Sequence, residues 1–269
     1  MNLSGRNVLI TGASRGIGAG LARAFGVEGA RVIGAARSVD AVAEVVGPHG
    51  GVAVSLDAAN LDDVDGFIDR VEHEHGPIDV LINNAGIEVN ALFEDTTSEQ
   101  INQLITVNLL APMQLTHQAL PKMLERGHGS LVYTSSIAAA GGNPTLATYA
   151  ASKAGLTRFA ESVRMELTHD DIDVTILHLG PVETEMWDRI DDGGDANALV
   201  RRGEKLRVLS VASVDDVSRA AVEAVRSGKR EVRLPKRMAI APALNVLGTR
   251  TNELVYRGID VRGAAGKRG

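Results

Sequence analysis

The segment Thr11-Gly12-Ala13-Ser14-Arg15-Gly16-Ile17-Gly18 follows the short apolar run Asn7–Thr11 and precedes Leu21–Phe25, whose apolar residues recur at helical spacing. A strand, a glycine-rich turn and a helix in this order indicate the first unit of an α/β fold. Glycine allows positive φ and lets the backbone approach a ligand without an intervening Cβ. The N–H groups at the start of the helix favour a diphosphate. The spacing is G-x-x-x-G-x-G rather than G-x-G-x-x-G, so its place between strand and helix is what strengthens the signal.

Further short runs rich in β-branched residues alternate with helical segments along the chain. They are continuous rather than alternating in polarity, which is typical of parallel strands covered by helices on both faces. The series predicts an open, doubly wound parallel sheet with ligands outside the carboxyl ends of its strands. The runs are Arg31–Ala35, Gly51–Leu56, Asp79–Asn83, Ser130–Thr134 and Val174–His178, with Lys229–Arg237 as a last edge strand.

The composition is that of one large α/β domain. The 269 residues include 29 glycines and no cysteine, which excludes disulfides, thiolate metal sites and a cysteine nucleophile. Scattered histidines show no metal-ligand spacing, so no metal site is expected. The chain has no repeat or linker, and we expect a single domain over 1–269. It starts without the apolar stretch of a signal peptide and has no apolar run long enough to span a membrane, so we expect a cytoplasmic protein.

The net charge of −6 conceals an asymmetry. Residues 226–269 contain 11 Lys and Arg against 3 Asp and Glu, a charge of +8, whereas the preceding 225 residues carry −14. An acidic body argues against nucleic acid as a partner. The basic extension, about 229–269, is interpreted first as an edge strand with solvated charges. The alternative is weak peripheral contact of its basic residues and of Met238–Leu247 with anionic lipid.

A basic residue stands where a NAD-binding unit carries an acid for the ribose hydroxyl. About 20 residues after the glycine segment, the second predicted strand is followed by Arg37. A carboxylate there would repel a 2′-phosphate, whereas Arg37, helped by Arg15, would bind one. We therefore expect NADP(H) to be preferred over NAD(H), the alternative being that both arginines are simply solvated.

Tyr149 and Lys153 stand four residues apart in a predicted helix from Ala147 to about Thr168. Residues at this spacing share a helix face, so the phenol and the ammonium can point into the same space. A nearby cation favours the phenolate and suits the tyrosine to proton exchange with an alcohol or carbonyl oxygen. Upstream, Ser135 and Ser136 follow a predicted strand at its carboxyl end.

With these motifs in place, the sequence resembles the short-chain dehydrogenase/reductase family in its single-domain form. The resemblance covers Arg6 to Met186 and rests on the glycine segment, Asn83-Asn84-Ala85-Gly86, Asn108, Ser136 and Tyr149-Ala150-Ala151-Ser152-Lys153, all in family order. It implies a Rossmann-type, mainly parallel seven-stranded sheet in a three-layer αβα arrangement. It also implies an oxidoreductase that interconverts a ketone and a secondary alcohol, acting as a homodimer or homotetramer. The alternative is a non-catalytic NADP(H)-binding sensor or scaffold.

The resemblance also implies residue roles. Tyr149 would be the acid/base, Ser136 would polarise the substrate oxygen, and Lys153 would bind the nicotinamide ribose and lower the pKa of Tyr149. Asn108 would hold a water in a proton relay, and Ser136 is preferred to Ser135 because the family's serine lies thirteen residues before its tyrosine. Besides Tyr149 and Lys153, the candidate cofactor contacts are Gly12, Ser14, Arg15, Gly16, Ile17, Gly18, Arg37, Asp57, Ala58, Asn84, Ala85, Gly86, Gly180, Val182 and Thr184.

The segment from Glu185 to about Leu209 is long and rich in Gly and Asp, and it follows Thr184 where the family places a substrate lid. We therefore favour a lid over residues 185–209 rather than a plain surface loop. Most of the candidate pocket residues are apolar, which favours an aliphatic, alicyclic or acyl-type ketone. One departure from the family is Leu179, where a proline is usual. The pocket candidates are Glu88, Ile137, Ala138, Asn143, Met186 and Trp187.

Overall fold

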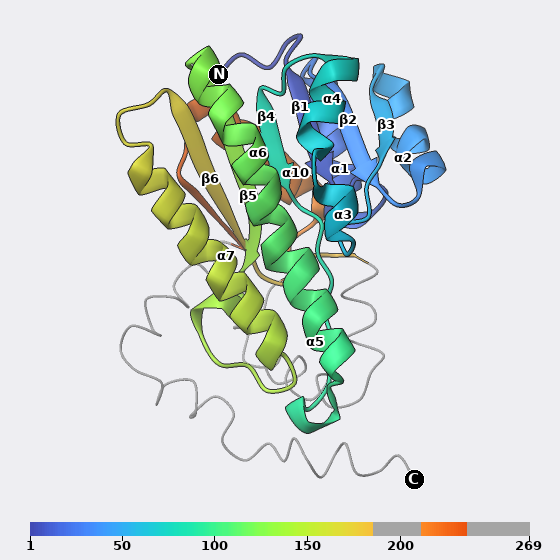
Figure 1. The fold of residues 1–269 in the computed structure, drawn as a ribbon, viewed down its shortest axis with the longest axis vertical. Helices are drawn as coiled ribbons and strands as arrows, with labels where there is room; N and C mark the ends of the chain where they lie inside the picture. The colour runs from blue at the N-terminus through green and yellow to red at the C-terminus, as the bar shows by residue number, and fades with distance from the viewer. Residues whose placement is uncertain (185–210, 236–269) are drawn as a thin grey trace.

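The computed structural model describes residues 1–184 and 211–235, and its centre is a seven-stranded sheet in the order β3-β2-β1-β4-β5-β6-β7. Every neighbouring pair in this sheet is parallel. The fold class expected from the sequence is confirmed. In chain order the strands are β1 Asn7–Thr11, β2 Arg31–Ala36, β3 Val52–Ser55, β4 Val80–Asn83, β5 Gly129–Ser136, β6 Ile172–Leu179 and β7 Glu231–Leu234 (Figure 1).

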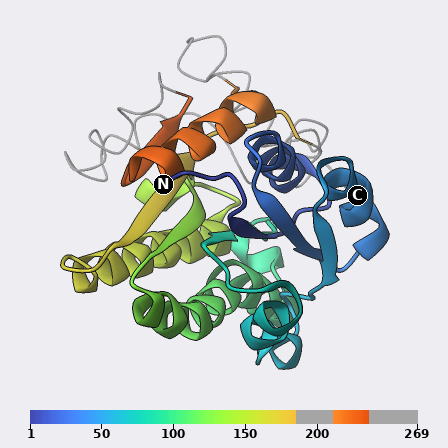
Figure 2. The same ribbon diagram turned by 90° about the horizontal axis from the view of Figure 1, so that it is seen from above.

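Helices cover both faces of the sheet, as Figure 2 shows from above. One face carries α1 Gly16–Val27, α2 Val39–Val46 and α10 Val214–Ser227. The other side carries α3 Leu61–Val64, α4 Phe67–His75, α5 Ser98–Ile105, α6 Ala111–Arg126 and α7 Ala147–Glu166. Short turns complete the described elements: η1 Gly47–His49, η2 Phe93–Asp95, η3 Thr106–Leu110 and η4 Ile137–Ala140.

The strands are apolar throughout because both of their faces are buried. In β1, Val8 and Ile10 belong to the core under α1 and α10, whereas Leu9 between them belongs to the core under α6 and α7. Such a strand needs apolar residues at every position rather than at alternate ones. This is why the strand runs could be recognised in the sequence.

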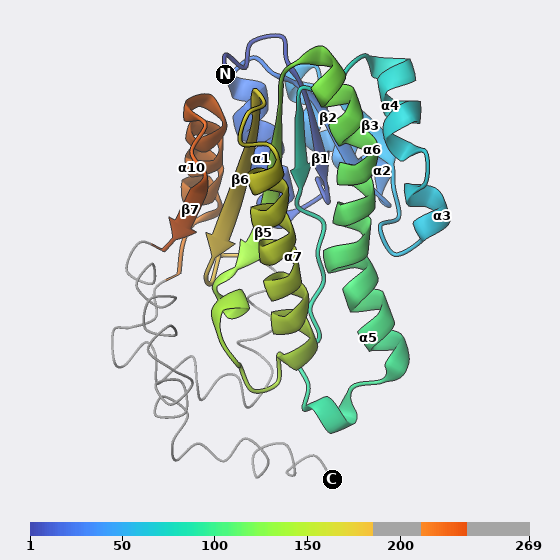
Figure 3. The ribbon, with the colours of Figure 1, turned by 60° about the vertical axis from the view of Figure 1, so that its left-hand side comes forward.

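The sheet changes its winding direction between β1 and β4. From β1 the chain moves outward to β2 and β3, and then returns to place β4 on the other side of β1. The loops that leave β1 and β4 therefore diverge, and the crevice between them is where open α/β sheets bind ligands. The β5–α7 connection and the α5 end of the helical layer extend beyond the sheet at this same carboxyl end (Figure 3).

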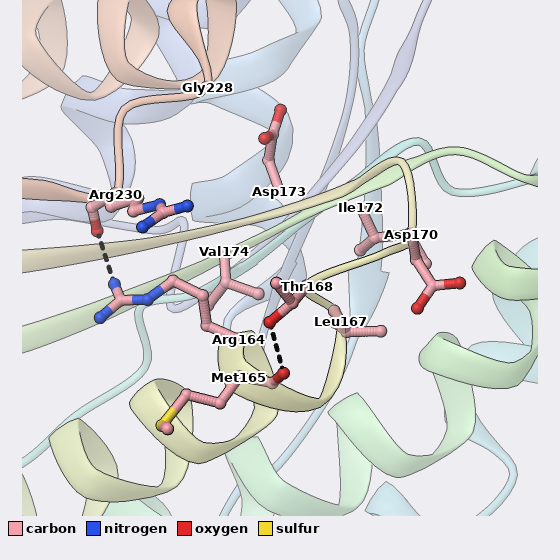
Figure 4. A pocket seen from close by; sticks show the side chains of 10 residues that line it. All are labelled: Arg164, Met165, Leu167, Thr168, Asp170, Ile172, Asp173, Val174, Gly228 and Arg230. Carbon is pink, nitrogen blue, oxygen red and sulfur yellow. Dashed lines mark hydrogen bonds between the residues drawn. The ribbon is translucent and has the colours of Figure 1, made fainter.

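A cavity of about 220 Å³ lies at the opposite, amino end of β6. Its lining includes Arg164, Thr168, Asp173 and Arg230, and the Arg164 guanidinium donates a hydrogen bond to the Arg230 carbonyl (Figure 4). The eight residues of β6 separate this cavity from the carboxyl end by roughly 23 Å at about 3.3 Å per residue. The cavity is therefore remote from the predicted reaction centre.

Several expected features fall on parts of the chain that the structure does not describe. The 185–209 segment expected as a lid and the 236–269 part of the basic extension lie outside the described residues, as do Met186 and Trp187. The single-domain assignment, the lid and the extension stay predictions. Within the described residues, no helix combines the length and the apolar character needed to cross a bilayer.

Candidate active site

Ser136, Tyr149 and Lys153 come together at the carboxyl end of β5. Ser136 is the last residue of the strand, and its side chain forms a hydrogen bond with that of Tyr149. One helical turn after Tyr149 in α7, Lys153 places its Nζ 5.8 Å from the centroid of the tyrosine ring. The neighbouring Ser135 hydroxyl is instead engaged with Thr157, with 2.7 Å between the two oxygens. Two hydroxyls and an ammonium group thus meet at one point.

Lys153 is buried, with 4% of its surface exposed. Its Nζ donates a hydrogen bond of 2.9 Å to the carbonyl oxygen of Thr134, in the strand β5. Burial disfavours the charged form and lowers the pKa of Lys153 from 10.5 to about 8. At neutral pH the side chain is still mainly an ammonium group, and it loses its charge only a little above neutrality.

The pKa of Tyr149 is shifted in the direction opposite to the one expected. Burial of the phenol raises this pKa from 10.0 to about 12, the hydrogen bond with Ser136 lowers it, and the charge of Glu88 raises it. The expectation that Lys153 lowers the pKa of Tyr149 is therefore corrected, because desolvation is the largest cause of the shift and Lys153 is not among its causes. Around neutral pH, Tyr149 keeps its proton and is suited to donate it.

Asn108 is fully buried in η3, the π-helical turn between α5 and α6. Its Oδ1 accepts the N–H of Ile87 at 2.9 Å and its Nδ2 donates to the Ile87 carbonyl at 2.9 Å. The same Nδ2 donates to Oγ of Ser152 at 3.1 Å, and Ser152 donates to the Tyr149 carbonyl at 2.7 Å. Asn108 thus ties the loop after β4 to the helix that carries Tyr149 and Lys153. Sequence reasoning missed Ser152, whose only signal is its place inside the Tyr-x-x-x-Lys segment.

The start of α1 is open to an anion. Arg15 is its N-cap residue and makes no side-chain capping bond, and the first turn holds no acidic residue. By contrast, α5 has a full capping box from Thr97 and Gln100, and Ser213 caps α10. The first N–H groups of a helix lack intrahelical partners and can bind an anion there. The residues of this loop and first turn that were predicted to contact the cofactor are Gly12, Ser14, Arg15, Gly16, Ile17 and Gly18.

Two glycines of this loop are required by its geometry. Gly12 has φ +69°, and a Cβ on it would come within 2.9 Å of the Ala85 Cα. Gly16 has φ +54°, and its Cβ position lies 3.5 Å from Cγ2 of Thr184 in the segment after β6. The loops after β1, β4 and β6 therefore meet here. A glycine-lined loop at an uncapped helix start fits the diphosphate of a dinucleotide.

Thr11 holds the loops after β1 and β4 together. Its Oγ1 accepts the N–H groups of Asn84 and Ala85, each at 3.0 Å. Asn84 returns a hydrogen bond of 3.0 Å from Nδ2 to the Thr11 carbonyl. On the other side of this crossing, a Cβ on Gly86 would lie 3.4 Å from the Lys153 Nζ. The Asn84-Ala85-Gly86 segment thus joins the glycine loop to the Ser136, Tyr149 and Lys153 group.

The remaining candidates for cofactor binding follow other strand ends. Exposed Arg37 comes directly after β2, and Asp57 and Ala58 come two and three residues after β3. Asp57 is partly engaged within its own turn, since its Oδ1 accepts the Ala59 N–H at 3.0 Å. These residues extend the row of strand ends away from β1 in the order β1, β2, β3.

At the end of β6 the family usually has a proline, whereas this chain has Leu179, which remains paired in the sheet. Leu179 is a strand residue that pairs with Ser136 of β5 and Leu234 of β7. The next residue, Gly180, donates its N–H to the Leu234 carbonyl at 2.7 Å. Val182 forms a parallel bridge with Ala212, and Thr184 bonds to the Val182 carbonyl at 3.2 Å.

Four of the six candidate pocket residues are described. Ile137 and buried Ala138 belong to η4, which begins directly after Ser136. Asn143 donates from Nδ2 to the carbonyls of Ala138 and Gly141, at 3.4 and 2.9 Å. Glu88 is half-buried, and its charge acts on Tyr149. These four residues flank the side on which Ser136 and Tyr149 stand.

Comparisons with known proteins identify the family. The short chain dehydrogenase family model matches residues 6–194. A ketoacyl reductase of Nostoc sp. is 39% identical over 185 residues, covering 67% of this chain and 64% of that protein. A 3-oxoacyl-(acyl-carrier-protein) reductase of Escherichia coli is 32% identical over 204 residues, covering 75% of this chain and 83% of that protein.

A solved structure agrees with these relatives. A metagenomic short-chain oxidoreductase in complex with NADP superposes with a TM-score of 0.69 at 30% identity, covering 87% of this chain and 98% of the other. The family model alone spans well over half of the sequence. The chain therefore belongs to the short-chain dehydrogenase/reductase family and is an oxidoreductase of the kind that uses NAD(P)(H).

Proposed function

We propose that this protein interconverts a ketone and a secondary alcohol with NADP(H), using Tyr149 as the acid/base. The observation that carries the proposal is the arrangement of the Ser136 hydroxyl, the Tyr149 hydroxyl and the Lys153 ammonium at one strand end. Two hydroxyls at this point can both donate to one carbonyl oxygen, and a cation beside the phenol can stabilise the charge it acquires.

In the reductive direction, Ser136 and Tyr149 bind and polarise the substrate carbonyl oxygen. A nicotinamide cofactor held at this site would supply the hydride that the carbonyl carbon accepts. Tyr149 donates its proton to the oxygen, and its raised pKa keeps the phenol protonated at neutral pH until that step. Lys153 stabilises the resulting phenolate and binds the nicotinamide ribose. Asn108 holds the loop after β4 against α7. A water held there would return a proton to Lys153.

Two arginines support the preference for NADP(H). Arg37 directly follows β2, the strand whose end faces the adenosine ribose in dinucleotide-binding folds. Arg15 is the N-cap residue of α1, at the adjacent strand end. A guanidinium binds a phosphate with two parallel hydrogen bonds, whereas a carboxylate at this place would select the free hydroxyl of NAD.

The substrate class follows from the pocket and from the relatives. Ile137 and Ala138 present apolar side chains beside Ser136, and the curated relatives are named as ketoacyl reductases. We infer an aliphatic, alicyclic or acyl-type ketone as substrate, and a cytoplasmic location for the reaction.

The test is a panel of ketones and secondary alcohols followed by NADPH absorbance, with wild type and Tyr149→Phe. Wild type should turn over at least one ketone, with a higher kcat/KM for NADPH than for NADH. Removing the acid should lower kcat by about a hundredfold or more, with the Kd for NADPH nearly unchanged. Tyr133→Phe is the matched control, since the Tyr133 hydroxyl is buried against Thr116 at 2.9 Å, and it should keep its activity.

Three results would count against these assignments. Full reductase activity in Tyr149→Phe would overturn the mechanism. A markedly higher kcat/KM with NADH would overturn the cofactor preference. NADPH binding without turnover of any member of the panel would favour the sensor or scaffold instead.

A further inference from the structure

Asp57 lies on the side of the sheet where the adenosine end of a dinucleotide would bind. The group around Ser136 stands at the end of β5, on one side of β1 in the strand order, whereas β2 and β3 lie on the other side. The Leu56 N–H donates to the Ala36 carbonyl at 3.2 Å, so the chain leaving β3 runs beside the end of β2. A dinucleotide with its diphosphate at α1 and its nicotinamide at β5 would therefore extend its adenosine over these two strand ends.

Two polar groups of the turn after β3 can recognise adenine. The Asp57 Oδ1 accepts the Ala59 N–H at 3.0 Å, whereas no described residue donates to the Asp57 Oδ2 or accepts from the Ala58 N–H. An ionised carboxylate accepts hydrogen bonds and a backbone N–H donates one. Adenine offers the complementary pair, a 6-amino donor beside the ring acceptor N1. In hypoxanthine both roles are reversed, so this turn can distinguish the two bases if its direction is fixed.

The Asp63 carboxylate fixes the direction of Asp57. Its Oδ2 accepts the Asp57 N–H at 2.6 Å, across the gap between the end of β3 and the first turn of α3. On the other side of Asp57, its carbonyl accepts the Asn60 N–H at 3.0 Å. Both peptide groups that flank Asp57 are therefore held, and the direction of its side chain and of the Ala58 N–H is determined with them.

Arg70 in turn holds Asp63 in place. Its Nη2 lies 3.3 Å from the Asp63 Oδ1 and donates to the Asp63 carbonyl at 2.9 Å, while its Nη1 donates to the Asp65 carbonyl at 2.9 Å. The guanidinium also lies over the Phe67 ring, 5.5 Å from its centroid. One carboxylate oxygen of Asp63 thus binds a guanidinium and the other a peptide N–H, so Asp63 acts through Asp57 rather than on a ligand.

We propose that Asp63 is a positioning residue that orients Asp57 and Ala58 toward the adenine base of the cofactor, and that it thereby sets the preference for adenine over hypoxanthine. The inference rests on the proposed function, in which Asp57 and Ala58 are cofactor contacts. Tyr149 and the reacting carbon lie at the other end of the dinucleotide. Loss of Asp63 should therefore weaken cofactor binding and leave kcat nearly unchanged.

The test measures the Kd of two cofactors for the full chain by calorimetry, without substrate. NADPH is compared with reduced nicotinamide hypoxanthine dinucleotide phosphate, which has an oxo group in place of the 6-amino group and is otherwise the same. The measured quantity is the ratio of the two Kd values. Wild type should bind NADPH at least about tenfold more tightly, since a hydrogen bond to a charged group is at stake. If NADH is the better cofactor, the pair without the 2′-phosphate gives the same ratio.

Four variants separate positioning from general stability. In Asp63→Ala the ratio should fall by about tenfold through weaker NADPH binding, whereas Asp63→Asn keeps an oxygen for the Asp57 N–H and should keep most of the ratio. Asp62→Ala is the matched control, because Asp62 is an exposed neighbour in α3 whose side chain bonds to no described residue, and it should leave the ratio unchanged. Asp57→Ala should abolish the ratio, and adding Asp63→Ala to it should change the ratio no further.

The outcomes distinguish this inference from the proposed function. A wild-type ratio in Asp63→Ala or in Asp57→Ala, or no base preference in wild type, would overturn the role of Asp63 and leave the reductase intact. Equal weakening of both cofactors together with a lower Tm would show that Asp63 only supports the fold, and would overturn it as well. If the ratios change as expected while no ketone or alcohol is turned over, the proposed function fails and the role of Asp63 stands.

Discussion

Lys153 holds an ammonium group in a buried position, and this opposes folding at neutral pH. Its pKa falls from 10.5 in the unfolded chain to about 8 in the fold. A difference of this size corresponds to roughly 3 kcal/mol at pH values below about 8, where both states are protonated. The penalty fades as the pH rises from about 8 toward 10.5, because in this range the lysine releases its proton on folding, and that release costs less free energy at higher pH. Stability therefore increases with pH in this window as far as Lys153 is concerned.

Replacing Lys153 with Met should separate stability from activity. At pH 7 the variant should have a higher free energy of unfolding than wild type, and so a higher Tm. The gain is up to roughly 3 kcal/mol, reduced by the loss of the hydrogen bond to the Thr134 carbonyl. Its advantage should shrink as the pH rises above 8, while its reductase activity falls at least a hundredfold. Thermal unfolding at several pH values and NADPH turnover measure these effects.

Lys122→Met is the matched control for this substitution. Lys122 bonds to Asp69 at 2.7 Å and its pKa is raised by that hydrogen bond rather than lowered. The control should gain no stability at pH 7 and keep its activity. A Lys153→Met protein that is less stable than wild type at pH 7, with a gap that does not depend on pH, would contradict the argument. In wild type, reductase activity should decline as the pH rises through about 8, because the charge beside Tyr149 is lost.

Residue spacing predicts which side chains share an element, but not which elements they join. The interval between Tyr149 and Lys153 places both on one face of a helix, and the structure agrees. The link from Asn108 through Ser152 to Tyr149 spans two helices and a loop, and no local pattern encodes it. The direction of the Tyr149 pKa shift was also missed, because it depends on burial and on Glu88, which stands far away in sequence.

At the scale of elements, the strands were predictable and their ends were not. Every strand run expected from the sequence overlaps an observed strand, since full burial demands continuous apolar residues. β5 extends through Ser135 and Ser136. Because these two residues are polar, hydrophobicity alone does not predict that the strand continues this far. Pairing with the whole length of β6 keeps these two residues in the sheet. The π-turn around Asn108 was not predicted from the sequence, and its Asn108 side chain bonds to Ile87, which lies 21 residues earlier in the chain.

The contact between α1 and α10 depends on Gly20. A Cβ at this position would lie 2.2 Å from Cγ1 of Val214 and 2.8 Å from Oγ of Ser218. Gly20→Ala should therefore force the helices apart and lower the free energy of unfolding by about 1–3 kcal/mol. For a domain of this size that corresponds to a fall in Tm of about 2–4 °C per kcal/mol, which thermal unfolding followed by circular dichroism can measure.

Gly47→Ala is the control for backbone effects of the same substitution. Gly47 has right-handed φ and ψ of −55° and −43°, and its added Cβ would meet no atom within 4 Å. Pro48 follows Gly47, and a side chain before proline is disfavoured in this helical backbone, so the variant reports the backbone cost of an added Cβ that meets no neighbour. It should lose less stability than Gly20→Ala. If Gly20→Ala and Gly47→Ala had the same Tm, close packing between α1 and α10 would not explain the glycine.

At the scale of the whole molecule, we predict a homodimer or homotetramer. Leu110 at the end of η3, Leu124 on α6 and Met165 on α7 are exposed apolar side chains, and α6 and α7 lie on the outer face of one layer (Figure 1). Such side chains gain stability when a second copy covers them. Light scattering after size exclusion should give two or four times the mass of one chain. A monomeric mass at micromolar concentration would refute this prediction.

The basic extension stays a prediction at this scale. Its described beginning includes β7, the edge strand expected from the sequence, in which Glu231 pairs with Arg233 at 2.7 Å. The edge strand itself is as expected, whereas Glu231 and Arg233 are partly buried and paired with each other rather than simply solvated. Contact of the extension with anionic lipid concerns residues outside the described part of the chain.

The strand order also determines when the sheet can close during synthesis. β1 ends at Thr11, whereas β4, its neighbour on one side, begins only at Val80. At roughly 5 to 20 residues per second, a ribosome leaves that edge of β1 unpaired for several seconds. Val8, Leu9 and Ile10 form this edge, and all three are fully buried in the finished fold. During this interval the nascent chain exposes an apolar strand edge with no hydrogen-bonding partner. Chaperone binding in that interval would raise the yield of folded enzyme.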